Sequence, residues 1–277
     1  MSSLAQGWCG FARIEPMEIT AIFVNMLMGV YSILGSFGWA VVIVSIFLRL
    51  IVLPLVIPGM KAGKKMRDLQ PKLKELQTQY KDDKKGLANA QMEFYKKHGI
   101  NPLSGCLPQI LTVAVLLLFL GAFNKLTDYN LGKLKVEDLN KQLIPALQVR
   151  EGFKLNMKFG PADLTMSPAK AFATGNPLVW FLPIFFLLGS AVTQFLSAKM
   201  MMPNPKLDEK VVNKATPGEK EDDMMAAMRT QSMYMMPAMS IFIGWSFSTG
   251  LVLYWFISSL LSVVQQLIVE KVTATDK

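Results

Sequence analysis

The feature that most constrains this chain is a series of long apolar runs. A transmembrane helix needs about 20 mainly apolar residues to cross a hydrocarbon core about 30 Å thick. The chain has charge-poor runs, four of them close to that length, at 38–57, 103–123, 177–197, 234–247 and 251–269. The run at 234–247 is short, so its helix must begin near residues 224–229 to cross fully. The sequence therefore predicts an all-α integral membrane protein with five transmembrane helices.

The charged residues gather between these runs, although 52% of the chain is apolar. The separation of charged segments from apolar runs is typical of membrane proteins, and it predicts where spans and loops alternate along the chain. We expect an amino-terminal segment at 1–35 and five spans at 36–58, 101–124, 176–199, 224–247 and 249–270. Between the spans we expect a cytoplasmic helical hairpin at 59–100, an external loop at 125–175 and a cytoplasmic loop at 200–223. A tail at 271–277 follows the last span.

Arg49 is the only charged residue inside these apolar runs. At a rise of about 1.5 Å per residue, it lies roughly 17 Å and 12 Å from the two ends of the first run. A charge at that depth costs several kcal/mol, so such residues usually face a bundle interior or a water-filled cavity. We expect Arg49 to face a wet polar pocket. Snorkelling of its side chain to the interface is the alternative.

A shorter helix is expected before the first span. Between 15 and 34, apolar residues recur at helical spacing, while Glu18, Asn25, Gly29 and Ser32 fall on the other side. This pattern favours an amphipathic helix that lies in the membrane interface. A sixth span is the rival interpretation.

Lysine and arginine residues near the membrane predict the orientation, because short cytoplasmic loops are enriched in them. The segment 61–97 holds 11 of them against five acids, which places it in the cytoplasm. With five spans, the amino terminus is then outside and the carboxyl terminus cytoplasmic. The external loop carries eight basic residues, but long loops translocate largely regardless of their charge.

The cytoplasmic segment has its own helical pattern. Apolar residues recur at steps of three and four on both sides of a polar turn at 81–86. They are Met66, Leu69, Leu73, Leu76, Tyr80, Leu87, Ala90 and Phe94. We expect an antiparallel helical hairpin, with Pro71 bending its first helix or marking a restart. The lysines suit anionic headgroups, an acidic protein or RNA, and the sequence leaves these partners open.

Several motifs together resemble one known family. They are Arg49 followed by Leu53-Pro54-Leu55, LQPKLKEL at 69–76, HGINPLSGCLP at 98–108, MMPAMSIF at 235–242, GLVLYW at 250–255 and SVVQQ at 262–266. In this order and over residues 36–270, they resemble the YidC/Oxa1/Alb3 membrane protein insertases, in their bacterial five-span form.

The resemblance implies that the spans surround a hydrophilic groove, open to cytoplasm and lipid, in which Arg49 is the family's groove arginine. Such a protein inserts and helps to fold membrane proteins, alone or with the Sec translocon, and needs no nucleotide. Elementary physics agrees, because a fixed positive charge in a low dielectric attracts the acidic tail of a client. Burial of the client's apolar segment, at roughly 25 cal/mol per Å², then provides the driving force.

Other polar residues are candidates for the groove. Ser45 lies one turn before Arg49 and therefore on the same face, where relatives carry a small hydroxyl residue. Gln109 and Thr112 are about one turn apart on the second span, and Gln194 lies in the middle of the third. Ordinary interhelical hydrogen bonding is the alternative for each. Relatives carry a glutamine where this chain has Thr112, which shifts the expected polarity of that span to Gln109.

Three aromatic residues complete the candidate site. Trp255 and Tyr254 fall where the family has aromatic residues that contact substrate, and Trp245 on the fourth span is a further candidate. The alternative is an interfacial aromatic side chain.

The remaining residues argue against catalysis. His98 is the only histidine, and the apolar runs contain no acidic residue, which disfavours an intramembrane protease and a proton pump. We therefore expect no enzyme activity, no metal and no cofactor. A small channel or transporter in which Arg49 selects anions is the competing class, although the chain shows no convincing internal repeat.

The expected partners are nascent membrane protein clients and the lipid bilayer, with the Sec translocon and the ribosome as further candidates. No sequence-specific nucleic acid binding is expected. The expected location is the bacterial cytoplasmic membrane.

Overall fold

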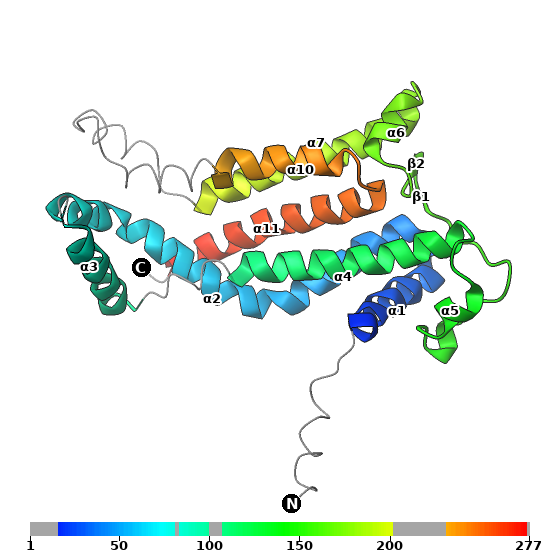
Figure 1. Cartoon of the computed structure of the whole chain (residues 1–277), viewed down its shortest axis with the longest axis horizontal. Helices are drawn as coiled ribbons and strands as arrows, with labels where there is room; N and C mark the ends of the chain where they lie inside the picture. The colour runs from blue at the N-terminus through cyan, green and yellow to red at the C-terminus, as the bar shows by residue number, and fades with distance from the viewer. Residues whose placement is uncertain (1–15, 81–82, 100–106, 202–230, 276–277) are drawn as a thin grey trace, which may run out of the picture. The chain divides into compact units, whose positions relative to one another are not determined.

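The computed structural model describes residues 16–80, 83–99, 107–201 and 231–275 (Figure 1). These residues form helices almost throughout. The helices are α1 (Pro16–Leu34), α2 (Phe37–Gln79), α3 (Lys84–Lys97), α4 (Leu107–Asn130), α5 (Val136–Asn140), α6 (Pro168–Ala173), α7 (Pro177–Met201), α10 (Met236–Gly244) and α11 (Thr249–Thr275). A 3-10 turn η2 (Pro145–Leu147) and a π-helical segment η3 (Gln231–Met235) complete the helical part. Strands β1 (Lys158–Phe159) and β2 (Ala162–Asp163) pair antiparallel.

Within the described residues, four helices are long and apolar enough to cross a membrane. Their candidate spans are Phe37–Leu69 in α2, Ile110–Asn130 in α4, Pro177–Met200 in α7 and Thr249–Lys271 in α11. The prediction of an all-α, multi-pass membrane protein is therefore confirmed. The described part of the expected fourth span is a shorter apolar helix, Met233–Gly244. Its expected beginning, like the expected loop from residue 202 onward, lies outside the described residues, so the count of five spans stays a prediction.

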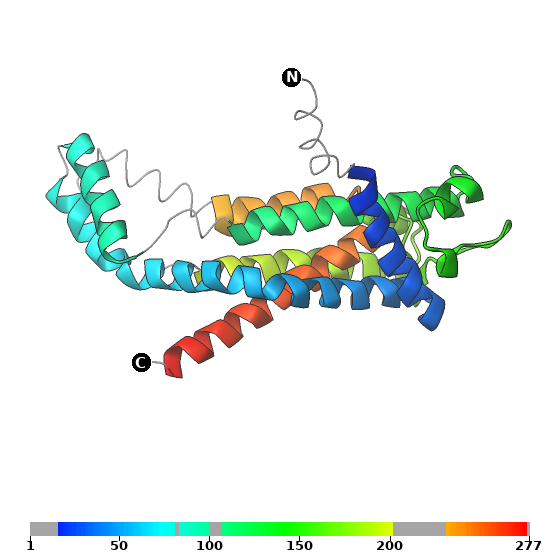
Figure 2. The ribbon, with the colours of Figure 1, turned by 90° about the horizontal axis from the view of Figure 1, so that it is seen from below.

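The first span and the first arm of the hairpin are one helix. Figure 2 shows α2 as a continuous ribbon, and it runs for 43 residues with Pro54, Pro58 and Pro71 inside it. The expected restart at Pro71 is therefore wrong. A proline removes one backbone donor and crowds the preceding turn, but here the helix continues through all three. No break separates the expected segments 36–58 and 59–100.

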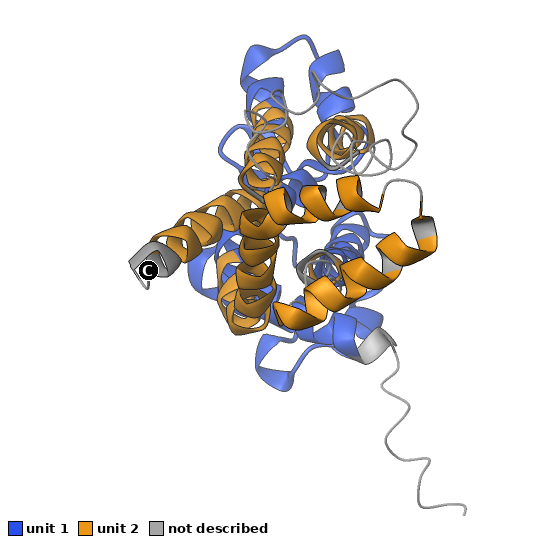
Figure 3. Ribbon diagram, turned by 90° about the vertical axis from the view of Figure 1, so that its left-hand side faces the viewer, with its two compact units in different colours: residues 1–45, 113–184, 246–255 blue, residues 46–112, 185–245, 256–277 orange. Residues whose placement is uncertain are grey.

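The chain divides into two compact units (Figure 3). Unit 1 comprises Met1–Ser45, Val113–Ile184 and Ser246–Trp255, and unit 2 comprises Ile46–Thr112, Phe185–Trp245 and Phe256–Lys277. Each of the helices α2, α4, α7 and α11 contributes residues to both units.

An aromatic core stabilises unit 1. Phe37, Phe119 and Phe123 are fully buried, and the rings of Phe37 and Phe123 lie 5.8 Å apart. The ring of Phe123 covers Gly250 at the start of α11, where a Cβ atom would overlap it. Aromatic side chains bury large apolar areas, so this layer supplies much of the packing energy of the unit.

The segment after α4 folds back onto α1. Asn25 on α1 donates to the Gln142 carbonyl at 2.6 Å, and its Oδ1 accepts from the Ile144 amide at 2.8 Å. Tyr31 Oη accepts from the Asn156 amide at 2.9 Å. The face of α1 that was expected to be polar thus contacts the loop through Asn25.

The packing of α1 is uneven along its apolar residues. Phe23, Leu27, Met28 and Tyr31 are buried, whereas Ile22 is 58% exposed. The loop after α4 covers the side that carries Tyr31.

The helical hairpin lies within unit 2. Asp83 caps the amino-terminal end of α3, because its Oδ1 accepts a hydrogen bond from the Gly86 amide at 2.9 Å. At the other end of α3, the His98 carbonyl accepts from Lys65 Nζ at 2.5 Å. Lys65 lies 14 residues, or about 21 Å of helix, before the end of α2. The end of α3 therefore lies beside an earlier part of α2, while its beginning follows the end of α2, so the two helices run antiparallel. Leu73 and Leu87 are buried in this hairpin.

Candidate functional site

The guanidinium of Arg49 contacts hydroxyl groups of two other helices. Nη1 donates to Thr112 Oγ1 on α4 at 3.4 Å, and Nη2 donates to Ser262 Oγ on α11. All three residues belong to unit 2, and Arg49 is half-buried. A charge inside an apolar span needs polar partners, and here hydroxyl groups supply them.

Ser262 was not among the expected site residues. Its hydroxyl donates to the Ser258 carbonyl at 2.9 Å, so its oxygen lone pairs are directed toward Arg49. Ser258, Ser259 and Ser262 recur on α11 at helical spacing. This recurrence of small hydroxyl residues on one face of the last span was the signal in the sequence that could have identified Ser262.

Hydroxyl and amide groups also join α7 to its neighbours in unit 2. Thr193 and Ser259 share a hydrogen bond of 2.6 Å, and Gln266 Nε2 donates to Ser197 Oγ at 2.6 Å. Gln194 Oε1 accepts from Ser240 Oγ on α10 at 2.7 Å. Gln194 therefore makes one interhelical hydrogen bond, as its alternative anticipated, while its place in the groove stays a prediction.

Some buried polar atoms remain without a protein partner in the described part of the chain. In unit 2 they include Nε2 of Gln194, Oε1 of Gln265 and Oε1 of Gln266. Buried polar groups are normally satisfied by protein or by ordered water. The interior of this unit thus offers hydrogen-bonding sites to water or to a polar ligand.

The other expected polar residues have different surroundings. Ser45 is buried in unit 1, and its hydroxyl donates to the Val41 carbonyl of its own helix at 2.6 Å. The backbone of Gln109 belongs to α4, and its side chain is not among those that the structure describes. Of the expected polar set, the structure brings together Arg49 and Thr112.

The expected aromatic residues do not form one cluster. Tyr254 is buried in the core of unit 1, where its ring stacks on Phe119 with a centroid distance of 4.3 Å. Trp255, also in unit 1, is half-buried. Trp245 follows α10 in unit 2 and is 38% exposed. Tyr254 is therefore a core residue, because a ring with 3% exposure leaves almost no surface for a client.

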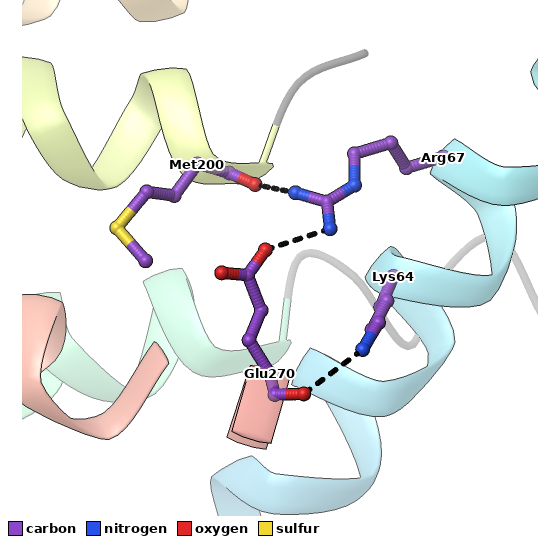
Figure 4. Close-up of polar contacts among 4 residues, drawn as sticks. All are labelled: Lys64, Arg67, Met200 and Glu270. Atoms are coloured by element: carbon purple, nitrogen blue, oxygen red, sulfur yellow. Dashed lines mark hydrogen bonds and ion pairs between the residues drawn. The ribbon is translucent and has the colours of Figure 1, made fainter. Parts of the chain in front are cut away.

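A second polar cluster lies in unit 2 near the ends of α7 and α11, beside the middle of α2, and sequence reasoning missed it. Arg67 Nη2 pairs with Glu270 Oε1 at 2.8 Å, and Nη1 donates to the Met200 carbonyl (Figure 4). Lys64 Nζ donates to the Glu270 carbonyl at 3.3 Å. The cluster joins α2, α7 and α11. No sequence motif indicated it, because its members are up to 206 residues apart.

The described residues contain no group of three or more His, Cys, Asp or Glu side chains that could hold a metal ion. The partners of Arg49 described above are hydroxyl groups, and a guanidinium with such partners can bind and orient a polar segment.

Comparison with known proteins identifies relatives over nearly the whole chain. The family described as 60Kd inner membrane protein matches residues 29–276. A protein named membrane protein insertase YidC from Campylobacter jejuni is 29% identical over 98% of this chain and 39% of its own length. Proteins of the same name from Citrifermentans bemidjiense and Helicobacter pylori are 26% and 32% identical over 97% and 89% of this chain.

The chain spans less than two fifths of the length of these curated relatives, between 35% and 39%. The family match nevertheless covers the four candidate spans, the hairpin and Arg49. The chain therefore belongs to the 60Kd inner membrane protein family, the YidC/Oxa1/Alb3 family that its motifs resemble.

Proposed function

We propose that this protein is a membrane protein insertase and chaperone, which works alone or with the Sec translocon. Its substrates are nascent membrane proteins whose short polar tails must cross the bilayer. The family membership and the name of the relatives, membrane protein insertase YidC, support this class of activity.

The observation that carries the proposal is the environment of Arg49. The side chain extends from a span, and its guanidinium donates to the hydroxyl groups of Thr112 and Ser262. Hydroxyl partners leave the formal charge of the arginine in place. At an effective dielectric constant of about 20, a carboxylate 4 Å away would be attracted by about 4 kcal/mol.

In this proposal, electrostatic attraction acts on the client's tail and hydrophobic transfer acts on its apolar segment. Arg49 draws an acidic or polar tail into the membrane region, in a hydrophilic groove open to the cytoplasm and to lipid. The client's apolar segment meanwhile enters the lipid, at roughly 25 cal/mol per Å² of buried apolar area. No covalent step and no nucleotide are needed, so the protein is not an enzyme in this proposal.

The remaining groove residues are assigned by position. Gln109 and Gln194 would hydrate the groove, because amide groups exchange readily between water and client partners. Ser45, whose hydroxyl bonds to the Val41 carbonyl, would line the same helix face as Arg49 without exchanging partners. Trp255 and Trp245 would contact the apolar segment of the client. Tyr254 would support Trp255 from the core rather than contact the client, because its own ring is buried.

The proposed orientation follows the distribution of lysine and arginine. The hairpin of α2 and α3 faces the cytoplasm of a bacterium, together with the carboxyl terminus, and the loop after α4 faces outward. The ribosome and the Sec translocon would approach from the side of the hairpin, where Lys61, Lys65 and Lys72 are exposed.

Protease protection in liposomes tests the activity. A single-span client with a short external tail is added to liposomes that contain only this purified protein. We expect the tail to become protected, and empty liposomes with the same lipids are the control. Protection no greater than in empty liposomes would contradict autonomous insertion, and a steady anion flux through the protein liposomes would favour the channel class instead.

A further inference from the structure

The loop after α4 carries an exposed apolar turn, formed by residues 144–147. Ile144, Pro145 and Ala146 are exposed, and Ile144 keeps 52% of its surface. The 3-10 turn η2, which follows Ile144, has no buried residue. A surface turn in water is normally polar, and consecutive exposed apolar residues usually mark a contact surface. The apolar turn therefore needs an apolar environment that the chain itself does not supply.

The apolar turn is held on α1. Asn25 Oδ1 accepts from the Ile144 amide at 2.8 Å, and Asn25 Nδ2 donates to the Gln142 carbonyl at 2.6 Å. Leu147 reaches the same helix at Gly29, where a Cβ atom would meet its Cδ1 atom at 3.7 Å. These contacts fix the position of the turn and leave Ile144 exposed.

The turn lies on an apolar stripe of α1. Ile22, Asn25, Gly29 and Ile33 follow one another at steps of three and four residues, so they share one side of the helix. Asn25 and Gly29 contact the turn, whereas Ile22 and Ile33, on either side of them, are exposed. The apolar turn therefore lies between two exposed isoleucines and enlarges the exposed apolar surface of α1.

The turn also lies beside the last turns of a membrane span. The candidate span Ile110–Asn130 ends where α4 ends, and described residues follow it directly. Gln142 Oε1 accepts from Lys125 Nζ at 2.9 Å. Lys125 lies five residues, or about 7.5 Å of helix, before the end of α4. The loop thus folds back from the end of the span toward the membrane, and it brings Ile144 with it.

The backbone of the turn suits an apolar solvent. In lipid, backbone N–H groups must be satisfied within the protein. The Ile144 amide donates to Asn25, Pro145 has no N–H group, and the Leu147 amide donates to the Ile144 carbonyl at 2.9 Å. None of these three positions offers an unpaired N–H group. Asn25 therefore satisfies a donor that would be costly to place in lipid.

We propose that the apolar turn inserts between the lipids of the leaflet on its side of the membrane. The bilayer is the occupant because the surface continues that of a span: α1 packs on α4 at Gly121, where a Cβ atom would meet Thr20 at 3.2 Å. Lys125 extends from the apolar span to the polar Gln142, as lysines do at a membrane edge. The inference requires only that the chain spans a membrane, and it holds whether or not the protein inserts clients.

Nitroxide accessibility in liposomes tests the proposal. A spin label is attached at Ile144→Cys in the full chain, with Cys9→Ser and Cys106→Ser, in vesicles of phosphatidylcholine and phosphatidylglycerol. Collision rates are measured with oxygen, which concentrates in lipid, and with a water-soluble nickel chelate. We expect the oxygen-to-nickel ratio at residue 144 to be several-fold higher than at Glu137→Cys, an exposed polar position of α5.

Two further labels make the result interpretable. Leu117→Cys, an exposed position of the α4 span, gives the ratio expected for lipid. Ala146→Cys should give the same result as Ile144→Cys, which shows that the outcome does not depend on the loss of Ile144. A ratio equal to that of Glu137→Cys would overturn the proposal, because the turn would then lie in water. Low collision rates with both reagents would also overturn it, because a second copy of the chain would then cover the turn.

The role of Asn25 is tested in the same assay. Asn25→Ala should make the label at residue 144 more mobile and lower its oxygen-to-nickel ratio several-fold, because the turn loses its two hydrogen bonds to α1. Ser32→Ala, also on α1, is the matched control and should leave the ratio unchanged. Thermal unfolding shows whether each variant remains folded. A ratio that keeps its lipid value in Asn25→Ala would overturn the assignment of Asn25 as the residue that holds the turn in the membrane.

Discussion

Arg49 on α2 donates a hydrogen bond from Nη2 to the hydroxyl of Ser262 on α11, across 213 residues of sequence. The same hydroxyl donates to the Ser258 carbonyl at 2.9 Å. The serine is thus fixed by the helix backbone and presents its oxygen to the guanidinium. This relay holds the guanidinium at a defined place inside a span, through a hydroxyl group that carries no formal charge.

Replacement of Ser262 should therefore weaken the orientation of Arg49. The hydroxyl hydrogen bond contributes about 0.5–1.5 kcal/mol, so Ser262→Ala should slow insertion of a client with an acidic tail by about two- to tenfold. Ser262→Thr keeps the hydroxyl and should retain most of the rate. The measurement is the initial rate of tail protection in liposomes. Equal rates for Ser262→Ala and the unmodified protein would mean that Thr112 and water orient Arg49 sufficiently.

A glycine of the unit 1 core should be intolerant of any side chain. A Cβ atom at Gly250 would overlap the ring of Phe123, which is itself fully buried. Gly250→Ala should thus destabilise the protein by about 1–3 kcal/mol, the usual cost of overpacking. Gly29→Ala is the matched control, because its Cβ would meet Leu147 at an ordinary 3.7 Å. Thermal unfolding in detergent should show a lower Tm for the first variant only.

Asn25 should determine how firmly α1 holds the loop after α4. Its amide both donates to the Gln142 carbonyl and accepts from the Ile144 amide. Asn25→Ala leaves both backbone groups without this partner, which should increase amide hydrogen exchange at residues 142–147. Ser32→Ala is the control, since its hydroxyl bonds to the Gly29 carbonyl of its own helix. Unchanged exchange in Asn25→Ala would show that apolar packing alone holds the loop.

The hairpin should unfold locally without unfolding the spans. Leu87 is 4% exposed, and replacement of a buried leucine by alanine costs about 2–5 kcal/mol. Leu87→Ala should therefore increase proteolysis between residues 70 and 99 and leave the cleavage pattern of the spans unchanged. Asn89→Ala, an exposed position on the same helix, should behave like the unmodified protein. Loss of protection throughout the chain would contradict this independence.

The long apolar runs made the fold class predictable, because only a helix satisfies its own backbone hydrogen bonds in lipid. The hairpin was also predictable, since its apolar residues keep a helical period on both sides of one polar turn. The continuity of α2 through Pro71 was not. Local propensity argues against a proline inside a helix, and tertiary packing, with Leu73 buried two residues later, overrides it.

The site was predictable in part. Arg49 and Thr112 were recognised by their polarity within apolar runs, and they do contact each other. Ser262 and the Arg67–Glu270 pair were missed because their roles depend on which helices are neighbours in space. Tyr254 was assigned by its motif position, yet its ring lies in an aromatic core. Motif position alone does not tell which way a side chain faces.

The central claim is that the charge of Arg49 recruits the client's tail. The most direct measurement compares tail protection for two clients that differ only in an acidic or a neutral tail, in liposomes that contain the unmodified protein, Arg49→Lys or Arg49→Ala. The account predicts that Arg49→Ala impairs the acidic client selectively and that Arg49→Lys retains partial activity, because the charge remains without the planar fork. Equal activity of Arg49→Ala toward both clients would contradict it.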